Sequence, residues 1–488
     1  MTSLKNHRLV HLDLKGAPPK PDYLKNLYQL FTKWGATGII IEWEDCFPFK
    51  NDFEIITNKF YSVDNAIQIL QDARDAKLEV IPLFQTFGHL EFVLKHKEYV
   101  QFREVPLFPS SICPSHPDAF KLVTSLLTQI IDFHVGIKFL HIGADEVWHM
   151  GLCENCKSRL ENGETKEDLY LKHVKKVVEF IKLNWPEINV IMWDDMLRDF
   201  EEATLQTYNL KSLVEPMVWH YSPAENFNLP PELMRKYSYF DNIWVAGAFK
   251  GATGGSQLLP VVNHHASNIL HWMCLVNQLK TNYRGIALTG WSRYDHFSAL
   301  CELLPTSLPS LGVCLLIVEE KNFDSTTISR VEADLGYKNE VTSLCRLSNV
   351  PFTFTFLGWE ILSGISKFMN VRQSINLTLS SEQIDTWMNS WQVSNGLVNP
   401  MQLVSLVPVL NMHLGELNDI EKFLKNHMCT IFFDDTVTEW IGTYILPLKK
   451  KILDVIQTAD EQIALNLKFV EEALKIYKKP YLPYEMDC

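Results

Sequence analysis

Eight short apolar runs alternate with longer amphipathic stretches along the first 300 residues of the chain. Each run is almost continuously hydrophobic over four to six positions, which is typical of a strand buried on both faces. The runs occupy residues 8–14, 37–43, 79–85, 138–145, 190–195, 213–221, 243–251 and 285–291. Because buried parallel strands are joined by helical crossovers, eight such units predict an α/β fold, a (β/α)8 TIM barrel.

The stretches between these runs have the spacing of amphipathic helices. In residues 64–76, Ile67, Leu70 and Ala73 recur at three-residue steps, and residues 170–185 follow a similar pattern. A doubly wound open sheet is the competing arrangement. The first strand is not followed by the glycine-rich turn that binds a dinucleotide in that fold, so the barrel is the preferred prediction.

The alternation of strands and helices stops near residue 325. Residues 451–477 place apolar side chains such as Ile452 and Val455 at steps of three and four, which predicts one long amphipathic helix. We therefore expect a barrel domain over residues 1–325 and an α-helical C-terminal domain over residues 326–488.

Composition and charge limit the partners and the compartment. The formal net charge of -13 argues against nucleic acid as the main partner. The apolar stretch at residues 311–318 is far shorter than the ~20 residues of a membrane helix, so we expect no membrane partner. The N-terminus lacks the apolar core of a secretory signal, and the ten cysteines are scattered, as is typical of reduced thiols. These features predict a cytoplasmic protein, with a nuclear location left open.

Polar and aromatic side chains stand where the apolar runs end. A single acid at such a place is usually a helix cap, but the carboxyl ends of parallel strands meet at one rim of a barrel, where active sites lie. We therefore expect these side chains to surround one pocket. They are Asp13, Glu42, Glu44, Gln85, His89, Asp145, Glu146, Trp193, Asp194, Trp219, Tyr221, Lys250, Trp291 and Arg293.

Two adjacent acids, Asp145 and Glu146, follow the fourth run. In a regular strand neighbouring side chains point to opposite faces, so both reach one pocket only if the strand has already ended. The longer glutamate suits proton delivery, and burial beside a second carboxylate would raise its pKa and keep it protonated near neutral pH. The aspartate, held ionised, would stabilise nearby positive charge. Flat apolar walls for a sugar would come from Trp193, Trp219 and Trp291.

Several motifs resemble those of the family 20 glycoside hydrolases, the β-N-acetylhexosaminidases. HIGADEV (141–147) resembles that family's His-x-Gly-Gly-Asp-Glu stretch, and VIPLFQTFGHLEF (80–92) resembles its third-strand motif. The resemblance continues in order through IEWEDCFPF (41–49), IMWDDM (191–196) and LTGWSRYDHF (288–297). It extends over about residues 1–310 and is greatest to the hexosaminidase D branch, which begins directly at the barrel.

The resemblance implies an exo-β-N-acetylhexosaminidase, a glycoside hydrolase that removes terminal non-reducing β-linked GalNAc or GlcNAc. Catalysis in that family is retaining and substrate-assisted, because the 2-acetamido oxygen attacks the anomeric carbon and forms an oxazolinium. It implies a small glycoside or glycoconjugate as partner, without a metal or organic cofactor. The preference between the two sugars, the natural substrate and a homodimeric assembly stay open.

The resemblance also implies roles for individual residues. Asp145 would orient the acetamido group and stabilise its developing charge, and Glu146 would be the general acid and base. Glu44 or Asp45, together with His89, would support the acid. The expected substrate-binding residues are Asp13, Glu44, His89, Trp193, Asp194, Trp219, Tyr221, Trp291 and Arg293.

Four positions depart from the family's pattern. The first-strand arginine has no counterpart, and Lys15 lies near its place. The third-strand aspartate is Gln85, and the eighth-strand Trp-x-Glu becomes Trp291-Ser292-Arg293. Tyr221, from the sixth strand, stands in for a seventh-strand tyrosine. These changes bear on the sugar preference rather than on the reaction.

Two other functions remain open at this point. A glycan-binding barrel without turnover would keep the pocket, although a binder gains little from a protonated acid. A retaining glycosidase with a conventional nucleophile would need a second carboxylate about 5–5.5 Å from Glu146, with Glu44, Asp194 and Asp195 as candidates.

A lone cysteine pair, Cys153 and Cys156, follows the two acids. No second pair stands at zinc spacing, so we expect no metal site here, although the sequence does not decide the question.

Overall fold

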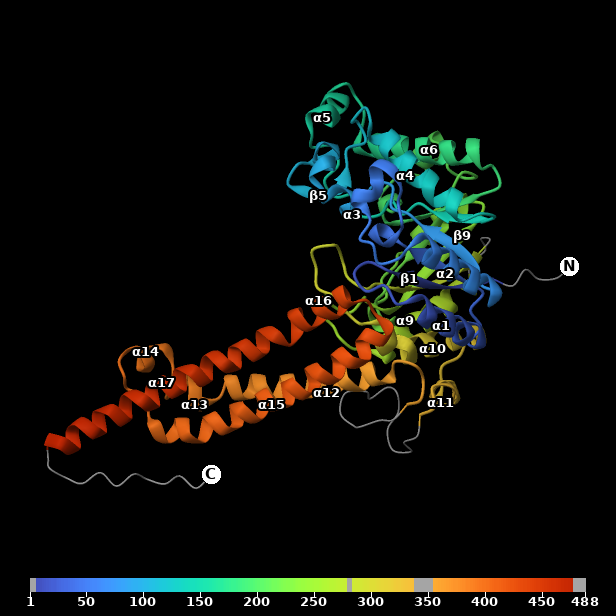
Figure 1. Cartoon of the computed structure of the whole chain (residues 1–488). Helices are drawn as coiled ribbons and strands as arrows, with labels where there is room; N and C mark the ends of the chain where they lie inside the picture. Colours follow the sequence, from blue (N-terminus) through green and yellow to red (C-terminus); the bar gives the residue numbers. More distant parts are fainter. Residues whose placement is uncertain (1–5, 279–282, 338–353, 477–488) are drawn as a thin grey trace. The chain divides into compact units, whose positions relative to one another are not determined.

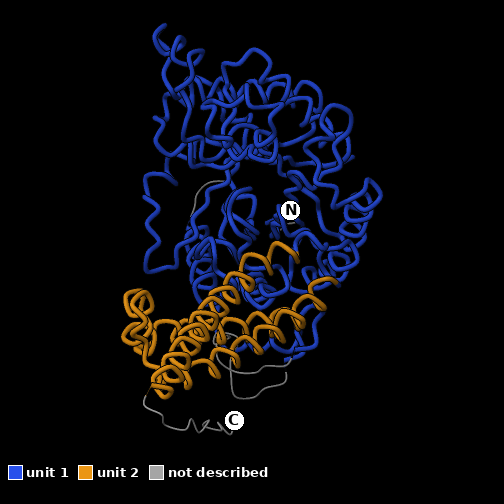
Figure 2. Tube along the Cα trace, turned by 60° about the vertical axis from the view of Figure 1, so that its left-hand side comes forward, with its two compact units in different colours: residues 1–346, 352–359, 430–436 blue, residues 347–351, 360–429, 437–488 orange. Residues whose placement is uncertain are grey.

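The computed structural model describes residues 6–278, 283–337 and 354–476, which divide into two compact units (Figure 2). Among these residues, the barrel unit comprises 6–278, 283–337, 354–359 and 430–436, and the helical unit comprises 360–429 and 437–476. Residues 338–353 and 477–488 of the predicted helical domain lie outside the described residues. The expected boundary at residue 325 stays a prediction.

Eight parallel strands close into a barrel in the order β1-β10-β9-β8-β7-β6-β3-β2 (Figure 1). They are β1 (His7–Asp13), β2 (Gly38–Glu42), β3 (Glu79–Leu83), β6 (Phe139–His141), β7 (Asn189–Trp193), β8 (Glu215–Trp219), β9 (Ile243–Lys250) and β10 (Tyr283–Gly290). Each strand coincides with one of the predicted apolar runs, so the TIM-barrel prediction is confirmed.

The register of β1 shows how the ring closes and why its strands are apolar. Leu9 pairs with Gly38 of β2 on one side and with Ala287 of β10 on the other. Inward side chains from the strands fill the interior, as in other barrels of this kind. The buried cluster consists of Leu9, Ile40, Ile81, Leu83, Phe139, Ile191, Trp193, Met217, Trp244, Ala246 and Ala287. Trp219 and Trp291 pack against it while staying partly buried.

Helices connect the strands, and several begin at the capping residues that the sequence supplies. Ser62 accepts a hydrogen bond from the backbone N–H of Asn65, and Thr165 accepts one from that of Asp168, each in a capping box. The helices of this unit are α1 (Pro21–Lys33), α2 (Val63–Asp75), α3 (Glu91–Leu94), α4 (Ala119–Phe133), α5 (Glu154–Glu161), α6 (Lys166–Asn184), α7 (Glu202–Thr207), α8 (Pro231–Lys236), α9 (Val262–Val276), α10 (Leu304–Glu320) and α11 (Ser325–Asp334).

An antiparallel hairpin interrupts the alternation between β3 and β6. It consists of β4 (Arg103–Val105) and β5 (Phe108–Ile112). These strands are three and five residues long and are partly exposed, so they lack the continuous apolar pattern that marks the barrel strands. They are not among the strands predicted from the sequence.

The C-terminal region is helical, as expected. Its helices are α12 (Trp359–Leu379), α13 (Glu382–Asp385), α14 (Ser390–Ser394), α15 (Pro400–Ile431), α16 (Asp434–Tyr444) and α17 (Leu446–Ile476). The long helix predicted at 451–477 is confirmed as α17, apart from residue 477, which is outside the described residues. In the part of the chain that the structure describes, no helix has the length and apolar character to cross a membrane.

The chain returns to the barrel unit between α15 and α16. The carbonyl oxygen of Ile431 accepts a hydrogen bond from the backbone N–H of Lys20 at 2.7 Å. Pro19 forms an isolated antiparallel bridge with Phe432, and the Thr436 hydroxyl donates to the carbonyl of Gly16. Residues 430–436, which include the last residues of α15 and the first residues of α16, are therefore part of the barrel unit, whereas the rest of both helices belongs to the helical unit.

Candidate active site

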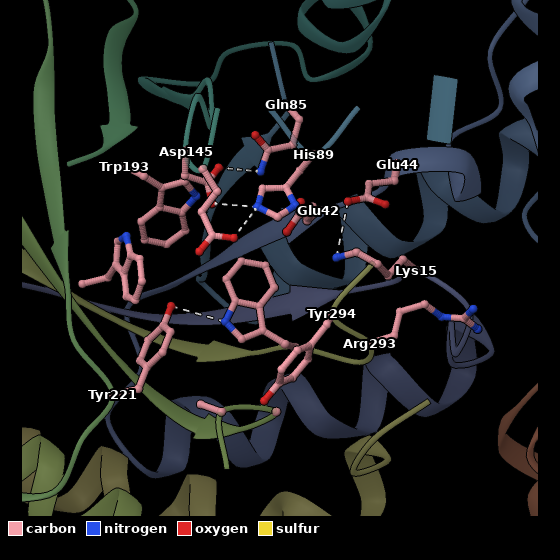
Figure 3. Close-up of a pocket in the computed structure, with 15 residues that line it drawn as sticks. Lys15, Glu42, Glu44, Gln85, His89, Asp145, Trp193, Tyr221, Arg293 and Tyr294 are labelled. Atoms are coloured by element: carbon pink, nitrogen blue, oxygen red, sulfur yellow. Dashed lines mark hydrogen bonds and ion pairs between the residues drawn. The ribbon is translucent and has the colours of Figure 1, made fainter. Parts of the chain in front are cut away.

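A cavity of about 250 Å³ opens at the carboxyl ends of the barrel strands (Figure 3). This volume is at the low end for small-molecule sites and suits roughly one sugar ring. Every barrel strand or the loop after it contributes a side chain or backbone segment. The lining residues are Lys15, Glu42, Glu44, Gln85, His89, Asp145, Glu146, Trp193, Trp219, Tyr221, Gly251, Ala252, Trp291, Arg293 and Tyr294.

The backbone after β6 brings both adjacent acids to the cavity. The strand ends at His141, and Gly143, Ala144 and Glu146 then take φ angles of 63°, 66° and 49°. These left-handed conformations break the alternation of a strand, as the prediction of a shared pocket required. At Gly143 a β-carbon would lie 1.9 Å from the Gln85 side-chain oxygen, so this turn needs glycine.

His89 lies between the two acids and contacts both. Its Nε2 is 3.2 Å from Glu146 Oε2 and 3.5 Å from Asp145 Oδ2. Gln85 Nε2 donates a hydrogen bond to Asp145 Oδ1 at 3.1 Å. Asp145 is thus held from two sides, while 36% of the Glu146 side chain remains exposed. Glu146 is the more accessible of the two acids.

The pKa values of the two acids shift in directions opposite to the expected ones. Burial raises the pKa of Asp145, although the charge of His89 opposes this shift. The hydrogen bond from His89 lowers the pKa of Glu146. Burial disfavours the imidazolium, but the Asp145 charge and the Glu146 hydrogen bond raise the pKa of His89 to about 10. The prediction of a raised Glu146 pKa was wrong here because a cation, and not only a carboxylate, adjoins this acid.

Aromatic side chains form one wall of the cavity. Trp193 ends β7 and is buried, Trp219 ends β8, and Trp291 follows β10. The ring centroids of Trp193 and Trp291 are 6.1 Å apart at an angle of 52°. Tyr221 stacks on Trp219 at 5.2 Å, and its hydroxyl accepts a hydrogen bond from the Trp291 indole at 3.3 Å. The four predicted aromatic residues therefore meet in one place.

A buried ion-pair network adjoins these rings, with Lys15 Nζ 5.2 Å from the centroid of the Trp291 ring. Lys15 Nζ is 3.3 Å from Glu44 Oε1 and 3.1 Å from Asp13 Oδ2, with all three side chains almost fully buried. The His296 imidazole also contacts Glu44, at 2.5 Å. The charges of Lys15 and His296 outweigh burial and lower the pKa of Glu44. Glu44 is therefore an anion whose oxygens are already engaged.

Three predicted residues, Asp13, Asp194 and Lys250, lie outside the cavity lining and hold residues of the lining in place, Lys250 by donating to the Trp291 carbonyl at 2.6 Å. Asp13 accepts a hydrogen bond from the backbone N–H of Ser292, next to Trp291, at 2.7 Å. Asp194 is fully buried and binds the Arg198 guanidinium at 2.7 and 2.8 Å. That guanidinium lies 4.8 Å from the Trp219 ring.

Asp195 is a residue that the list of expected site residues left out. Its Oδ2 accepts the backbone N–H of Glu146 at 2.9 Å, and its Oδ1 accepts the Trp219 indole N–H at 3.3 Å. Burial, and then the charge of Asp145, raise its pKa to about 7. The adjacent pair Asp194-Asp195 was the available signal, but the sequence alone does not show which member faces the acids.

Arg293 and Tyr294 line the far side of the cavity. In Figure 3 the Arg293 guanidinium is turned away from His89. It packs against Gly16, where a β-carbon would fall 1.9 Å from Nη2. Gly16 has a φ of 77°, so both its backbone and its missing side chain make room for this cation.

Known proteins are similar to this chain in sequence and in structure. The sequence pattern described as "Glycosyl hydrolase family 20, catalytic domain" matches residues 35–229. Hexosaminidase D of Homo sapiens is 36% identical over 462 residues, which are 93% of this chain and 94% of that protein. Hexosaminidase D of Bos taurus is 43% identical over 334 residues, 67% of this chain and 96% of that protein. A solved β-N-acetylhexosaminidase from Bacteroides fragilis is more distant, at 14% identity and a TM-score of 0.49 over 67% of this chain and 70% of its own. The identity to the first two relatives, over nearly their whole length, shows that the chain belongs to glycosyl hydrolase family 20.

Proposed function

We propose that this glycoside hydrolase is an exo-acting β-N-acetylhexosaminidase that removes terminal non-reducing β-linked GalNAc or GlcNAc. The observation that carries the proposal is the placement of Asp145 and Glu146 together in a cavity of one-ring size, joined by His89 and faced by indoles. The relatives named hexosaminidase D support it. A cavity of this size favours a terminal sugar over an internal one.

The proposed reaction needs no nucleophile from the protein. The acetamido oxygen of the substrate attacks the anomeric carbon while the bond to the leaving oxygen breaks, and Glu146 gives that oxygen its proton. Asp145 accepts the acetamido N–H and stabilises the positive charge of the oxazolinium. Water then attacks the same carbon from the leaving-group side and returns a proton to Glu146. Two displacements retain the anomeric configuration.

A bound sugar would also raise the pKa of Glu146 and so favour its protonated form. The exposed part of Glu146 faces the cavity, so a ring placed there would remove water from it. Loss of water disfavours the carboxylate and raises the pKa toward the protonated form. Asp145 is already buried, so a sugar removes little more water from it, and the Gln85 hydrogen bond and the His89 imidazolium favour its charged form.

The remaining side chains supply binding and orientation. Trp193, Trp219 and Trp291 enclose the acetamido methyl group, and the Tyr221 hydroxyl donates to its carbonyl. Arg293 lines the far side of the cavity, where a cation replaces the family's glutamate. Supporting positions are held by Asp13, Glu44 and Asp194, which fix the lining through the contacts described above.

The arrangement disfavours a conventional carboxylate nucleophile. Of the three candidates, Asp195 has both oxygens bound, to the Glu146 amide and the Trp219 indole. Glu44 is paired with Lys15 and His296, and Asp194 with Arg198. Each would have to give up these partners before it could attack an anomeric carbon.

The test is a comparison of 2-acetamido and plain 2-hydroxyl β-glycosides with the same aryl leaving group. We expect cleavage of the acetamido sugars alone. Glu146→Gln should lower kcat/KM by about 10³-fold for an alkyl aglycone and less for an activated aryl one, which needs less protonation. Asp145→Asn should lower it by about 10²-fold. Asp132→Asn, on the exposed side of α4, is the matched control.

Two results would overturn the proposal. Equal cleavage of 2-hydroxyl glycosides would point to a protein nucleophile, and trapping by a 2-fluoro sugar would identify it. Saturable sugar binding without hydrolysis between pH ~4 and ~7 would favour a glycan-binding barrel.

We also propose a cytoplasmic location, extending to the nucleus. It is supported by the eight cysteines of the described residues, all of which are free thiols. Cell fractionation tests the location, and light scattering distinguishes a monomer from a homodimer.

A further inference from the structure

A cluster of three thiols and one carboxylate lies away from the sugar cavity, between the β4–β5 hairpin and the start of α5. These elements are neighbours in Figure 1, although they are about 40 residues apart in the sequence. Glu104 belongs to β4, and Cys113 directly follows β5. Cys153 caps α5 and Cys156 lies in its first turn.

The four ligand atoms converge on one point. Cys113 Sγ is 3.3 Å from Cys153 Sγ and 3.7 Å from Cys156 Sγ. Glu104 Oε2 is 3.3 Å from Cys156 Sγ. All four atoms lie within 4.8 Å of one another.

These separations resemble those of a tetrahedral zinc site. With zinc–sulfur distances of about 2.3 Å and a zinc–oxygen distance of about 2.1 Å, the ligands would be about 3.8 Å (S–S) and about 3.6 Å (S–O) apart. The three spacings given above need to change by at most about half an ångström, and the other three, which are no longer than 4.8 Å, by at most about 1 Å. We propose that Glu104, Cys113, Cys153 and Cys156 bind one structural zinc ion.

The environment of Glu104 supports a bound cation. Only 1% of this residue is exposed, yet in the described part of the chain no lysine, arginine or histidine forms an ion pair with it. Its Oε1 accepts the backbone N–H groups of Leu152 and Cys153 at 2.6 and 2.8 Å, which leaves Oε2 directed at the thiols. A buried carboxylate without a counter-charge is costly, and a divalent ion among the thiols supplies that charge.

A surrounding layer of donors suits thiolates rather than thiols. The Ser115 hydroxyl is 3.0 Å from Cys156 Sγ, and Arg159 Nη1 donates to that hydroxyl at 3.1 Å. The backbone N–H of Cys156 points to Cys153 Sγ at 3.4 Å. Such contacts orient metal ligands and balance their negative charge.

Zinc accounts for the whole cluster better than a disulfide does. A bond between Cys113 and Cys153 would use two thiols and leave a buried thiol and a buried carboxylate without a role. Four protein ligands also complete a tetrahedral shell, and sites closed in this way are structural rather than catalytic. The ion would link the β4–β5 hairpin to the start of α5, where the loop that begins with Glu146 ends.

Metal content of the full-length protein tests the proposal. After expression with zinc and purification without chelators, we expect about one zinc per chain by elemental analysis. Cys113→Ser and Cys156→Ser should each retain less than about a tenth of that zinc, because a missing thiolate removes a ligand. The matched control is Cys274→Ser, an exposed thiol of α9, which should keep the full amount.

A cobalt spectrum makes the test independent of whether the variants fold. The wild-type chain reconstituted with Co²⁺ should show sulfur-to-metal charge transfer and the intense visible bands of a tetrahedral site. The proposal is wrong if metal-free wild-type protein takes up neither zinc nor cobalt. A thiol titration of the unfolded chain would then show whether all ten cysteines are free or whether two of them form a disulfide, and either result leaves the proposal overturned.

Discussion

Replacing His89 by asparagine should move the whole pH profile of kcat/KM to higher pH. His89 has a pKa of about 10, so it is a cation throughout the range in which the two acids titrate. A nearby cation favours the ionised form of a carboxyl group. Its removal should therefore raise the pKa of both Asp145 and Glu146.

The expected size of the shift follows from the contact distances and the exposure. An opposite charge within about 4–6 Å lowers a carboxyl pKa by about 1–3 units. His89 is 3.2 Å from Glu146 and 3.5 Å from Asp145, but 26% of His89 and 36% of Glu146 are exposed. Solvent screening at this exposure favours the low end, about one unit.

Both limbs of the profile should move in the same direction. The reaction requires an ionised Asp145 and a protonated Glu146, so the two limbs of the profile follow the pKa values of these two groups. Both pKa values rise when His89 is removed, so both limbs move to higher pH. The profile of kcat/KM reports these groups in the free enzyme. The matched control is His271→Asn, a half-buried histidine of α9 outside the cavity.

An unmoved profile, or a shift to lower pH, would refute this reasoning. The control profile should coincide with that of the wild-type protein.

Two further substitutions test the rim. Lys15→Met leaves two buried carboxylates without their shared cation and should lower the free energy of unfolding at pH 7 by about 3–5 kcal/mol. Because Lys15 lowers the pKa of Glu44, the loss of unfolding free energy should become smaller below about pH 4, where the carboxyl groups of the unfolded chain bind protons. Urea titrations at pH 7 and below about pH 4 measure this loss. An equal loss under both conditions would contradict the ion-pair explanation. Gly16→Ala should displace the Arg293 guanidinium and raise KM by about tenfold with a smaller change in kcat; an unchanged KM in a folded variant would show that Arg293 does not bind the sugar.

The fold and the family could be predicted because their signals are local. Each barrel strand is an unbroken apolar run, and such a run needs burial on both faces whatever surrounds it. The motif around Asp145 and Glu146 is likewise contiguous in the sequence. The resulting predictions of a TIM barrel, a helical C-terminal region and a hexosaminidase relationship are confirmed.

The features that the sequence did not reveal depend on contacts between distant segments. The family resemblance predicted that His89, 57 residues earlier, supports Glu146, but nothing in the sequence indicates that His89 lowers the pKa of this acid. The thiol cluster escapes detection for the same reason, because Cys113 precedes Cys153 by 40 residues and Glu104 lies on a short, irregular strand. Patterns of neighbouring residues report burial well, but they do not report which buried groups meet.

The left-handed turns around the cavity limit how the chain can evolve. Glu44, His89, Ala144 and Glu146 have φ angles of 46°, 49°, 66° and 49°, where a β-carbon costs roughly 1–2 kcal/mol each. Glycine would relieve that cost at every one of them, but at three it would delete an acid or an imidazole. Selection for thermal stability alone would therefore favour glycine at these positions and remove reactive groups from the cavity. Ala144 is the one of the four where a change to glycine removes no reactive group.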